Sequence, residues 1–196
     1  MEDQYALIKA AMSGNQKLVR QLLDHGVDVN ARDELGNTPL MLAILYGENA
    51  KVLQDLLNAK DLDTTATDAF GNTILMLAVL SGADKNVLRR ILSIGTGDIR
   101  TKNKLGGSAL TLAVAKKNID AVRLLAKHPD IGPAQLSDAI RALYDGRLHT
   151  SEDRKKILEI YKILKKTSTR QQAQIVSSLL TLAARTPNKK TIPSKN

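Results

Sequence analysis

The stretch that decides the fold is Asp33-Glu34-Leu35-Gly36-Asn37-Thr38-Pro39-Leu40-Met41-Leu42-Ala43-Ile44. It returns in altered form as Asp68-Ala69-Phe70-Gly71-Asn72-Thr73-Ile74-Leu75-Met76-Leu77-Ala78-Val79, and again as Asn103-Lys104-Leu105-Gly106-Gly107-Ser108-Ala109-Leu110-Thr111-Leu112-Ala113-Val114. The glycines at positions 36, 71 and 106 lie 35 residues apart each time. A repeat of this period indicates a solenoid, in which one small unit stacks on the next.

Each copy has the pattern of a tight turn followed by a helix. The glycine permits the positive φ of the turn, and Thr38 stands where a hydroxyl can cap a helix. Pro39 suits the first helical position, because no N–H is needed there. The alanines at 43, 78 and 113 predict that two helices approach closely. Gly82 is expected to end the helix, and Lys117 takes the place of that glycine in the third copy.

Helical spacing of apolar residues predicts further helices around these copies. A second helix in each copy is expected at 50–58, 85–93 and 119–127. Further helices are expected at 3–13, 16–25, 134–145, 151–165 and 170–184.

The residues also carry a resemblance to a known family. Thr38-Pro39-Leu40-Met41-Leu42-Ala43 resembles the ankyrin-repeat signature Thr-Pro-Leu-His-x-Ala, and residues 14–43 are similar to the family's second helix, hairpin and next entry. The chain departs from the signature where Met41, Met76 and Thr111 replace the histidine, and where positions 74 and 109 lack the proline. The resemblance implies an all-α ankyrin-repeat solenoid of stacked helix-turn-helix units with short hairpin fingers.

We expect one ankyrin-like domain over residues 1–185. Within it, residues 1–32 form an N-terminal capping repeat, 33–127 three fuller repeats, and 128–185 a degenerate repeat with a C-terminal cap helix. Residues 186–196 hold two prolines, three lysines and few apolar side chains, which predicts a disordered basic tail.

Composition disfavours several classes of protein. The chain has no cysteine, and its three histidines, His25, His128 and His149, are far apart in sequence without metal-ligand spacing. No glycine-rich phosphate loop or nucleophilic triad is present, so we expect no enzyme activity, no metal and no cofactor. The acidic N-terminus lacks a signal region, and no apolar run spans a bilayer. These features favour a cytoplasmic monomer. The Leu-Met-Leu-Ala variant and the Lys/Asn-rich tail also look like bacterial ankyrin proteins, which suggests an effector exported into a host cell.

The family resemblance implies a non-catalytic protein-interaction scaffold that binds another protein through its finger tips and concave first-helix face. Leu35, Phe70 and Leu105 occupy one slot in consecutive fingers and predict an exposed apolar ridge. Packing of these three residues on neighbouring fingers is the alternative interpretation. The predicted partner-binding positions are Arg32, Glu34, Leu35, Asn37, Leu45, Tyr46, Ala69, Phe70, Asn72, Leu80, Lys102, Lys104, Leu105 and Lys116.

Charge gives an alternative function. Residues 146–196 contain 12 Lys and Arg against 3 Asp and Glu, whereas residues 1–145 contain 17 of each kind. The basic quarter, 146–196, could therefore bind a polyanion, either nucleic acid or anionic lipid. No aromatic residues interleave the lysines for base stacking, which disfavours nucleic acid.

A possible modification site follows only from the family resemblance. Asn30 follows Asp28 and Val29 and resembles the ankyrin asparagine that host oxygenases hydroxylate. The alternative is that Asn30 hydrogen-bonds within its own hairpin.

Overall fold

The helices of the chain stand in two rows. The computed structural model describes residues 2–46, 49–95, 99–144 and 151–167. The first row holds α1 (Glu2–Met12), α3 (Pro39–Tyr46), α5 (Ile74–Ser81), α7 (Ala109–Ala115) and α9 (Pro133–Tyr144). The second row holds α2 (Gln16–Asp24), α4 (Ala50–Leu57), α6 (Lys85–Ser93), α8 (Ile119–Leu125) and α10 (Ser151–Thr167).

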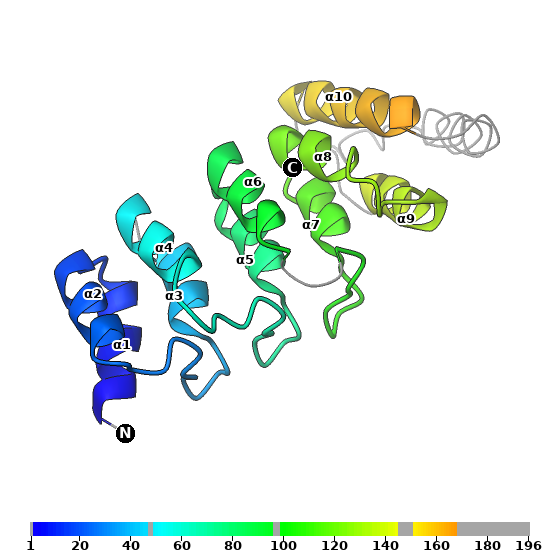
Figure 1. Cartoon of the computed structure of the whole chain (residues 1–196). Helices are drawn as coiled ribbons and strands as arrows, with labels where there is room; N and C mark the ends of the chain where they lie inside the picture. Colours follow the sequence, from blue (N-terminus) through cyan, green and yellow to red (C-terminus); the bar gives the residue numbers. More distant parts are fainter. Residues whose placement is uncertain (1, 47–48, 96–98, 145–150, 168–196) are drawn as a thin grey trace, which may run out of the picture.

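Each helix of the first row packs on the helix that follows it and on its neighbours in the same row (Figure 1). Long loops project from the first-row side of the stack, before α3, α5 and α7 (Figure 1). The described residues form no strand, only isolated bridges that join Thr67 to Thr73 and Lys102 to Ser108. The prediction of an all-α repeat solenoid is therefore confirmed.

The predicted helices agree with the observed ones to within two residues at each end. The helix predicted over 170–184 and the tail predicted over 186–196 lie outside the described residues. Among the helices that the structure describes, none is both long and apolar enough to cross a membrane.

The core lies between the two rows. In α3 every side chain from Pro39 to Ile44 is buried, and in α5 every side chain from Ile74 to Val79 is buried. A helix that is apolar all round needs cover on every side. Neighbouring helices supply this cover for α5, which contacts α3, α6 and α7. The alanines at 43, 78 and 113 are completely buried, in line with the close approach that their recurrence predicts.

Polar side chains and left-handed residues set the helix ends. The hydroxyls of Thr38, Thr73 and Ser108 accept the backbone N–H three residues later. At the other end, Gly82 has a φ of 76° and caps α5. Lys117 occupies the equivalent place after α7 with a φ of 54°, and its N–H donates to the carbonyl of Val114 as that of Gly82 does to Val79. A lysine therefore adopts a conformation that favours glycine.

Replacing Lys117 with glycine should stabilise the protein. A side chain in the left-handed region costs about 1–2 kcal/mol, part of which the greater freedom of glycine in the unfolded chain offsets. We expect Lys117→Gly to raise the free energy of unfolding by up to about 1 kcal/mol in urea titrations. Lys116 is the matched control, because its φ of −77° is an ordinary helical value. Lys116→Gly should lower the free energy of unfolding. Equal effects of Lys117→Gly and Lys116→Gly would contradict this explanation.

Candidate functional site

The three projecting loops, which we call fingers 1 to 3, are each closed by one side chain at their base. In finger 1, Oδ1 of Asp33 accepts the N–H groups of Leu35 at 2.9 Å and Asn37 at 2.7 Å. Asp68 and Asn103 repeat this arrangement. Asp68 binds the N–H groups of residues 70 and 72, and Asn103 those of residues 105 and 107. The closed turn leaves two residues at each tip, namely 34 and 35, 69 and 70, and 104 and 105.

Adjacent fingers are joined through their backbones. The N–H of Ala69 donates to the carbonyl of Leu35, and the N–H of Lys104 donates to the carbonyl of Phe70, both at 2.9 Å. A Cβ added to Gly36 or Gly71 would lie 3.3 Å from the backbone nitrogen of the next finger. Glycine therefore suits both positions, because it adopts the positive φ at no steric cost and leaves room for this close approach.

A buried polar chain joins fingers 2 and 3. Asn72 donates from Nδ2 to Oδ2 of Asp68 and accepts at Oδ1 a hydrogen bond from Nδ2 of Asn103, both at 2.8 Å. In finger 1, Nδ2 of Asn37 donates to Oδ2 of Asp33 at 2.9 Å. Both Asn37 and Asn72 are buried. These two predicted contact residues therefore offer little surface to a partner, because their amides are used inside the fingers.

The predicted apolar ridge is exposed. Leu35 is 56% exposed, Phe70 58% and Leu105 90%. Tyr46, at the end of α3, is 64% exposed, whereas Leu45 and Leu80 are half-buried and pack against the core. The alternative, packing on neighbouring fingers, describes Leu35 and Phe70 only in part, since more than half of each residue stays exposed. The ridge is thus a row of large apolar groups held on a hydrogen-bonded backbone.

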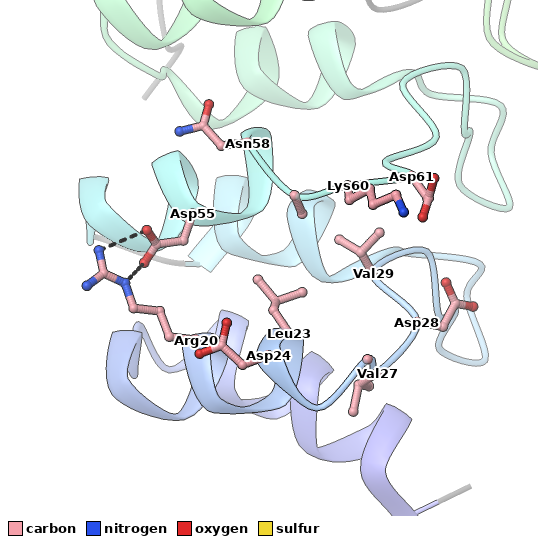
Figure 2. Close-up of a pocket in the computed structure, with 12 residues that line it drawn as sticks. Arg20, Leu23, Asp24, Val27, Asp28, Val29, Asp55, Asn58, Lys60 and Asp61 are labelled. Atoms are coloured by element: carbon pink, nitrogen blue, oxygen red, sulfur yellow. Dashed lines mark hydrogen bonds and ion pairs between the residues drawn. The ribbon is translucent and has the colours of Figure 1, made fainter.

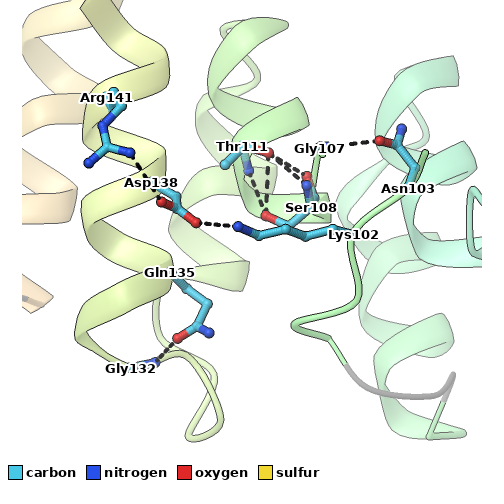
Figure 3. Close-up of polar contacts among 9 residues, drawn as sticks. All are labelled: Lys102, Asn103, Gly107, Ser108, Thr111, Gly132, Gln135, Asp138 and Arg141. Atoms are coloured by element: carbon cyan, nitrogen blue, oxygen red, sulfur yellow. Dashed lines mark hydrogen bonds and ion pairs between the residues drawn. The ribbon is translucent and has the colours of Figure 1, made fainter. Parts of the chain in front are cut away.

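The charged positions of the predicted site differ in their surroundings. Lys102 forms an ion pair with Oδ2 of Asp138 on α9 at 2.7 Å, and Arg141 lies 3.9 Å from the other oxygen (Figure 3). Lys104 and Lys116 are exposed, and no carboxylate in the described ranges pairs with either one. Lys102 therefore ties finger 3 to the last helix pair, while Lys104 and Lys116 present positive charge.

The remaining finger positions are exposed as well. Glu34 and Ala69 lie at the tips. Arg32 donates from Nη1 to the carbonyl of Thr67 at 2.8 Å, so this side chain links fingers 1 and 2.

Asn30 joins two successive loops. Its Nδ2 donates to the carbonyl of Asp61, and its Oδ1 accepts the N–H of Asp63, both at 2.7 Å. The hydroxyl and N–H of Thr65 hold the pKa of Asp63 below its ordinary value. The side chain of Asn30 therefore bonds to the next repeat, while its backbone N–H donates within its own hairpin to Oδ1 of Asp28 at 2.9 Å. Hydroxylation of this residue stays a prediction.

A groove of about 580 Å³ lies between α2 and α4 (Figure 2). Its polar lining mixes both signs of charge, and its one guanidinium, on Arg20, is bound to Asp55 at 2.9 Å. This hydrogen bond holds the pKa of Asp55 below its usual 3.8, the amide of Gln16 acts in the same direction, and burial opposes both. The groove is the seam between two repeats rather than a converging set of catalytic groups.

Histidines and acids do not gather into a metal site in the described part of the chain. His25 caps α2 and its ring lies against the carbonyl of Gln21. His128 lies beside Asp130 in the turn before α9, and His149 lies outside the described residues.

Comparison with known families agrees with this geometry. A model of ankyrin repeats in three copies matches residues 2–68 and 48–135. The chain belongs to the ankyrin-repeat family. Ankyrin repeats are generally protein–protein interaction modules and typically act as non-enzymatic scaffolds. No curated protein sequence matches this ankyrin-repeat chain.

The sequence left Asn103 out of the site, although this residue organises finger 3. The available signal was a paired change. Fingers 1 and 2 have Asp at the base and Asn four residues later, whereas finger 3 has Asn103 and Gly107. An aspartate at the base has a second oxygen that accepts the Nδ2 of the asparagine four residues later. Where glycine replaces that asparagine, the single amide oxygen of Asn103 is enough for the finger N–H groups.

Exchanging Asn103 for aspartate should weaken the joint between fingers 2 and 3. The carboxylate would keep the acceptor for the finger backbone, but it would place an oxygen against Oδ1 of Asn72. We expect Asn103→Asp to cost about 1–3 kcal/mol in urea unfolding. Asn118→Asp is the control, because Asn118 caps α8 through its oxygen alone and aspartate caps equally well. A free energy of unfolding that is unchanged in Asn103→Asp would contradict the assigned bond.

The pair between Arg20 and Asp55 should make stability depend on pH. A carboxyl whose pKa is lowered by folding stabilises the folded state above its unfolded pKa, here 3.8, and loses this effect as pH falls through the folded value. Asp55→Asn should therefore lower the melting temperature at pH 7, and the difference should shrink below about pH 4. In an Arg20→Met background the same exchange should show a weaker pH dependence. An equal dependence in both backgrounds would show that Arg20 is not the cause.

Proposed function

We propose that this ankyrin-repeat chain is a non-catalytic adaptor that binds a protein partner through the tips of its fingers and the adjoining faces of its first-row helices. The observation that carries the proposal is the placement of exposed apolar side chains. Among the described residues, the large exposed apolar side chains outside α10 all come from fingers or first-row helices: Tyr5, Met12, Leu35, Tyr46, Phe70 and Leu105. A contiguous exposed apolar surface usually marks an interface.

The rigidity of the fingers supports the same function. Binding costs less free energy when the contacting groups are already ordered. Asp68 fixes the turn that carries Phe70, and the Phe70 carbonyl is bound to finger 3. Phe70 therefore stands at the centre of the ridge on a backbone that needs no rearrangement. Large aromatic side chains at the centre of an interface often dominate its free energy.

The alternative function, polyanion binding through residues 146–196, falls largely outside the described residues. The described part of this region is α10, where Lys155, Lys162, Lys165 and Lys166 are exposed. Salt separates the two functions, because a polyanion complex weakens steeply between low and physiological salt. A monomeric state, a cytoplasmic location and delivery into a host cell stay predictions from the sequence.

Removing the Phe70 ring should abolish capture of the partner without unfolding the protein. We expect Phe70→Ala to cost about 2 kcal/mol of binding, or roughly thirtyfold in affinity. The measurement is affinity capture from cell lysate with nuclease present, with far-UV circular dichroism to check the fold. Leu158→Ala is the matched control, because Leu158 on α10 is 52% exposed and lies away from the fingers.

Capture that survives in Phe70→Ala would contradict the proposal. Capture that disappears with nuclease, or weakens steeply with salt in all variants, would instead favour the basic region.

A further inference from the structure

The row of joined fingers stops at finger 3. Each earlier finger offers the carbonyl of its second tip residue to the next finger, from Leu35 to Ala69 and from Phe70 to Lys104. The connection between α6 and α7 runs from residue 94 to 108, whereas that between α8 and α9 runs only from 126 to 132. The shorter connection forms no fourth finger. Within the described part of the chain, no N–H donates to the carbonyl of Leu105.

The side chains on the outer face of finger 3 are uncovered as well. Leu105 is 90% exposed, compared with 56% for Leu35 and 58% for Phe70. A Cβ built on Gly106 would meet nothing within 4 Å, whereas one on Gly36 or Gly71 would meet the backbone of the following finger. Finger 3 therefore has the same turn and glycine as fingers 1 and 2, but no following finger lies against that glycine.

The tip of finger 3 carries an unpaired positive charge. Lys104 precedes Leu105 and is exposed, with no carboxylate partner in the ranges that the structure describes. The neighbouring acid, Asp138, is already shared between Lys102 and Arg141 (Figure 3). A segment lying on this face would thus find a free carbonyl acceptor, an apolar side chain and an unpaired cation.

We propose that an extended, acidic segment of a partner protein binds the open face of finger 3, in the place that a fourth finger would take. A backbone N–H of the segment donates to the carbonyl of Leu105, an apolar side chain covers Leu105, and a carboxylate pairs with Lys104. Backbone addition of this kind supplies affinity, while the side chains supply specificity. The inference rests on the proposed function and refines it, since it names which finger receives the partner and which chemistry is recognised.

The test uses peptides as the probe. A phage-displayed library of random 12-residue peptides is panned against the full chain, with prior depletion on Leu105→Asp, and the enriched peptides are synthesised. Their affinities for wild type, Leu105→Asp and Leu35→Asp are measured by fluorescence anisotropy. Leu35 is the matched control, because it fills the same slot in finger 1, and circular dichroism checks that each variant is folded.

We expect enriched peptides to combine acidic and large apolar residues. Leu105→Asp should weaken them about tenfold or more, whereas Leu35→Asp should change affinity less than about twofold. Lys104→Glu should also weaken them, and exchange of the peptide carboxylates for lysine should restore binding to that variant.

Equal losses in Leu105→Asp and Leu35→Asp would overturn the inference while leaving the proposed function intact, since the whole ridge would then bind. Failure to enrich any peptide over Leu105→Asp, or peptides insensitive to both changes, would also overturn it. The proposed function has its own readout in the Phe70→Ala capture, so the two can fail separately.

Discussion

The structure of the fingers depends on one interaction, the acceptance of two backbone N–H groups by a single side-chain oxygen at each base. Asp33, Asp68 and Asn103 each hold their turn closed in this way. The closed turn fixes the direction of the tip carbonyl, and this direction lets the next finger bond to it. A loop without such a side chain would need other partners for its backbone, because polar groups that lose water must be bonded elsewhere. Regular stacking of the fingers thus follows from one acceptor repeated every 35 residues.

Much of the fold could be predicted because the repeat makes each unit depend mainly on its neighbours. The glycines, cap residues and apolar spacing are local signals, and they placed the described helices to within two residues. The asparagines at 37 and 72 entered the predicted site through the family resemblance, and the structure buries both of them. Recurrence marks a position as important, but it does not distinguish a residue that contacts a partner from one that holds the finger together. The signal that these residues pair with each other lies in finger 3, where both positions differ together: Asn103 replaces the aspartate and Gly107 replaces the asparagine.

The sequence predicted an exposed ridge, but it left open the alternative that neighbouring fingers cover these side chains. Leu35, Phe70 and Leu105 share a slot in the repeat, which places them in line whether or not they are covered. Cover depends on how far apart the fingers stand and on the length of the following connection. Both depend on tertiary packing. The Lys102–Asp138 pair is a further example, because the two residues meet only when α9 packs on α7.

The glycines of the fingers allow neighbouring backbones to pack closely while the side chains at the tips stay exposed. At Gly36 and Gly71 an added Cβ would lie 3.3 Å from the backbone nitrogen of the following finger, and fingers 1 and 2 are each hydrogen-bonded to their successor. This contact holds the backbone in place and leaves the tip side chains exposed. Such an arrangement favours binding, because little conformational entropy of the backbone is lost when a partner binds. Finger 3 has the bond to finger 2 but no successor, since the connection to α9 is short. The same shortening that ends the repeat pattern therefore leaves an ordered backbone edge beside the most exposed leucine of the ridge.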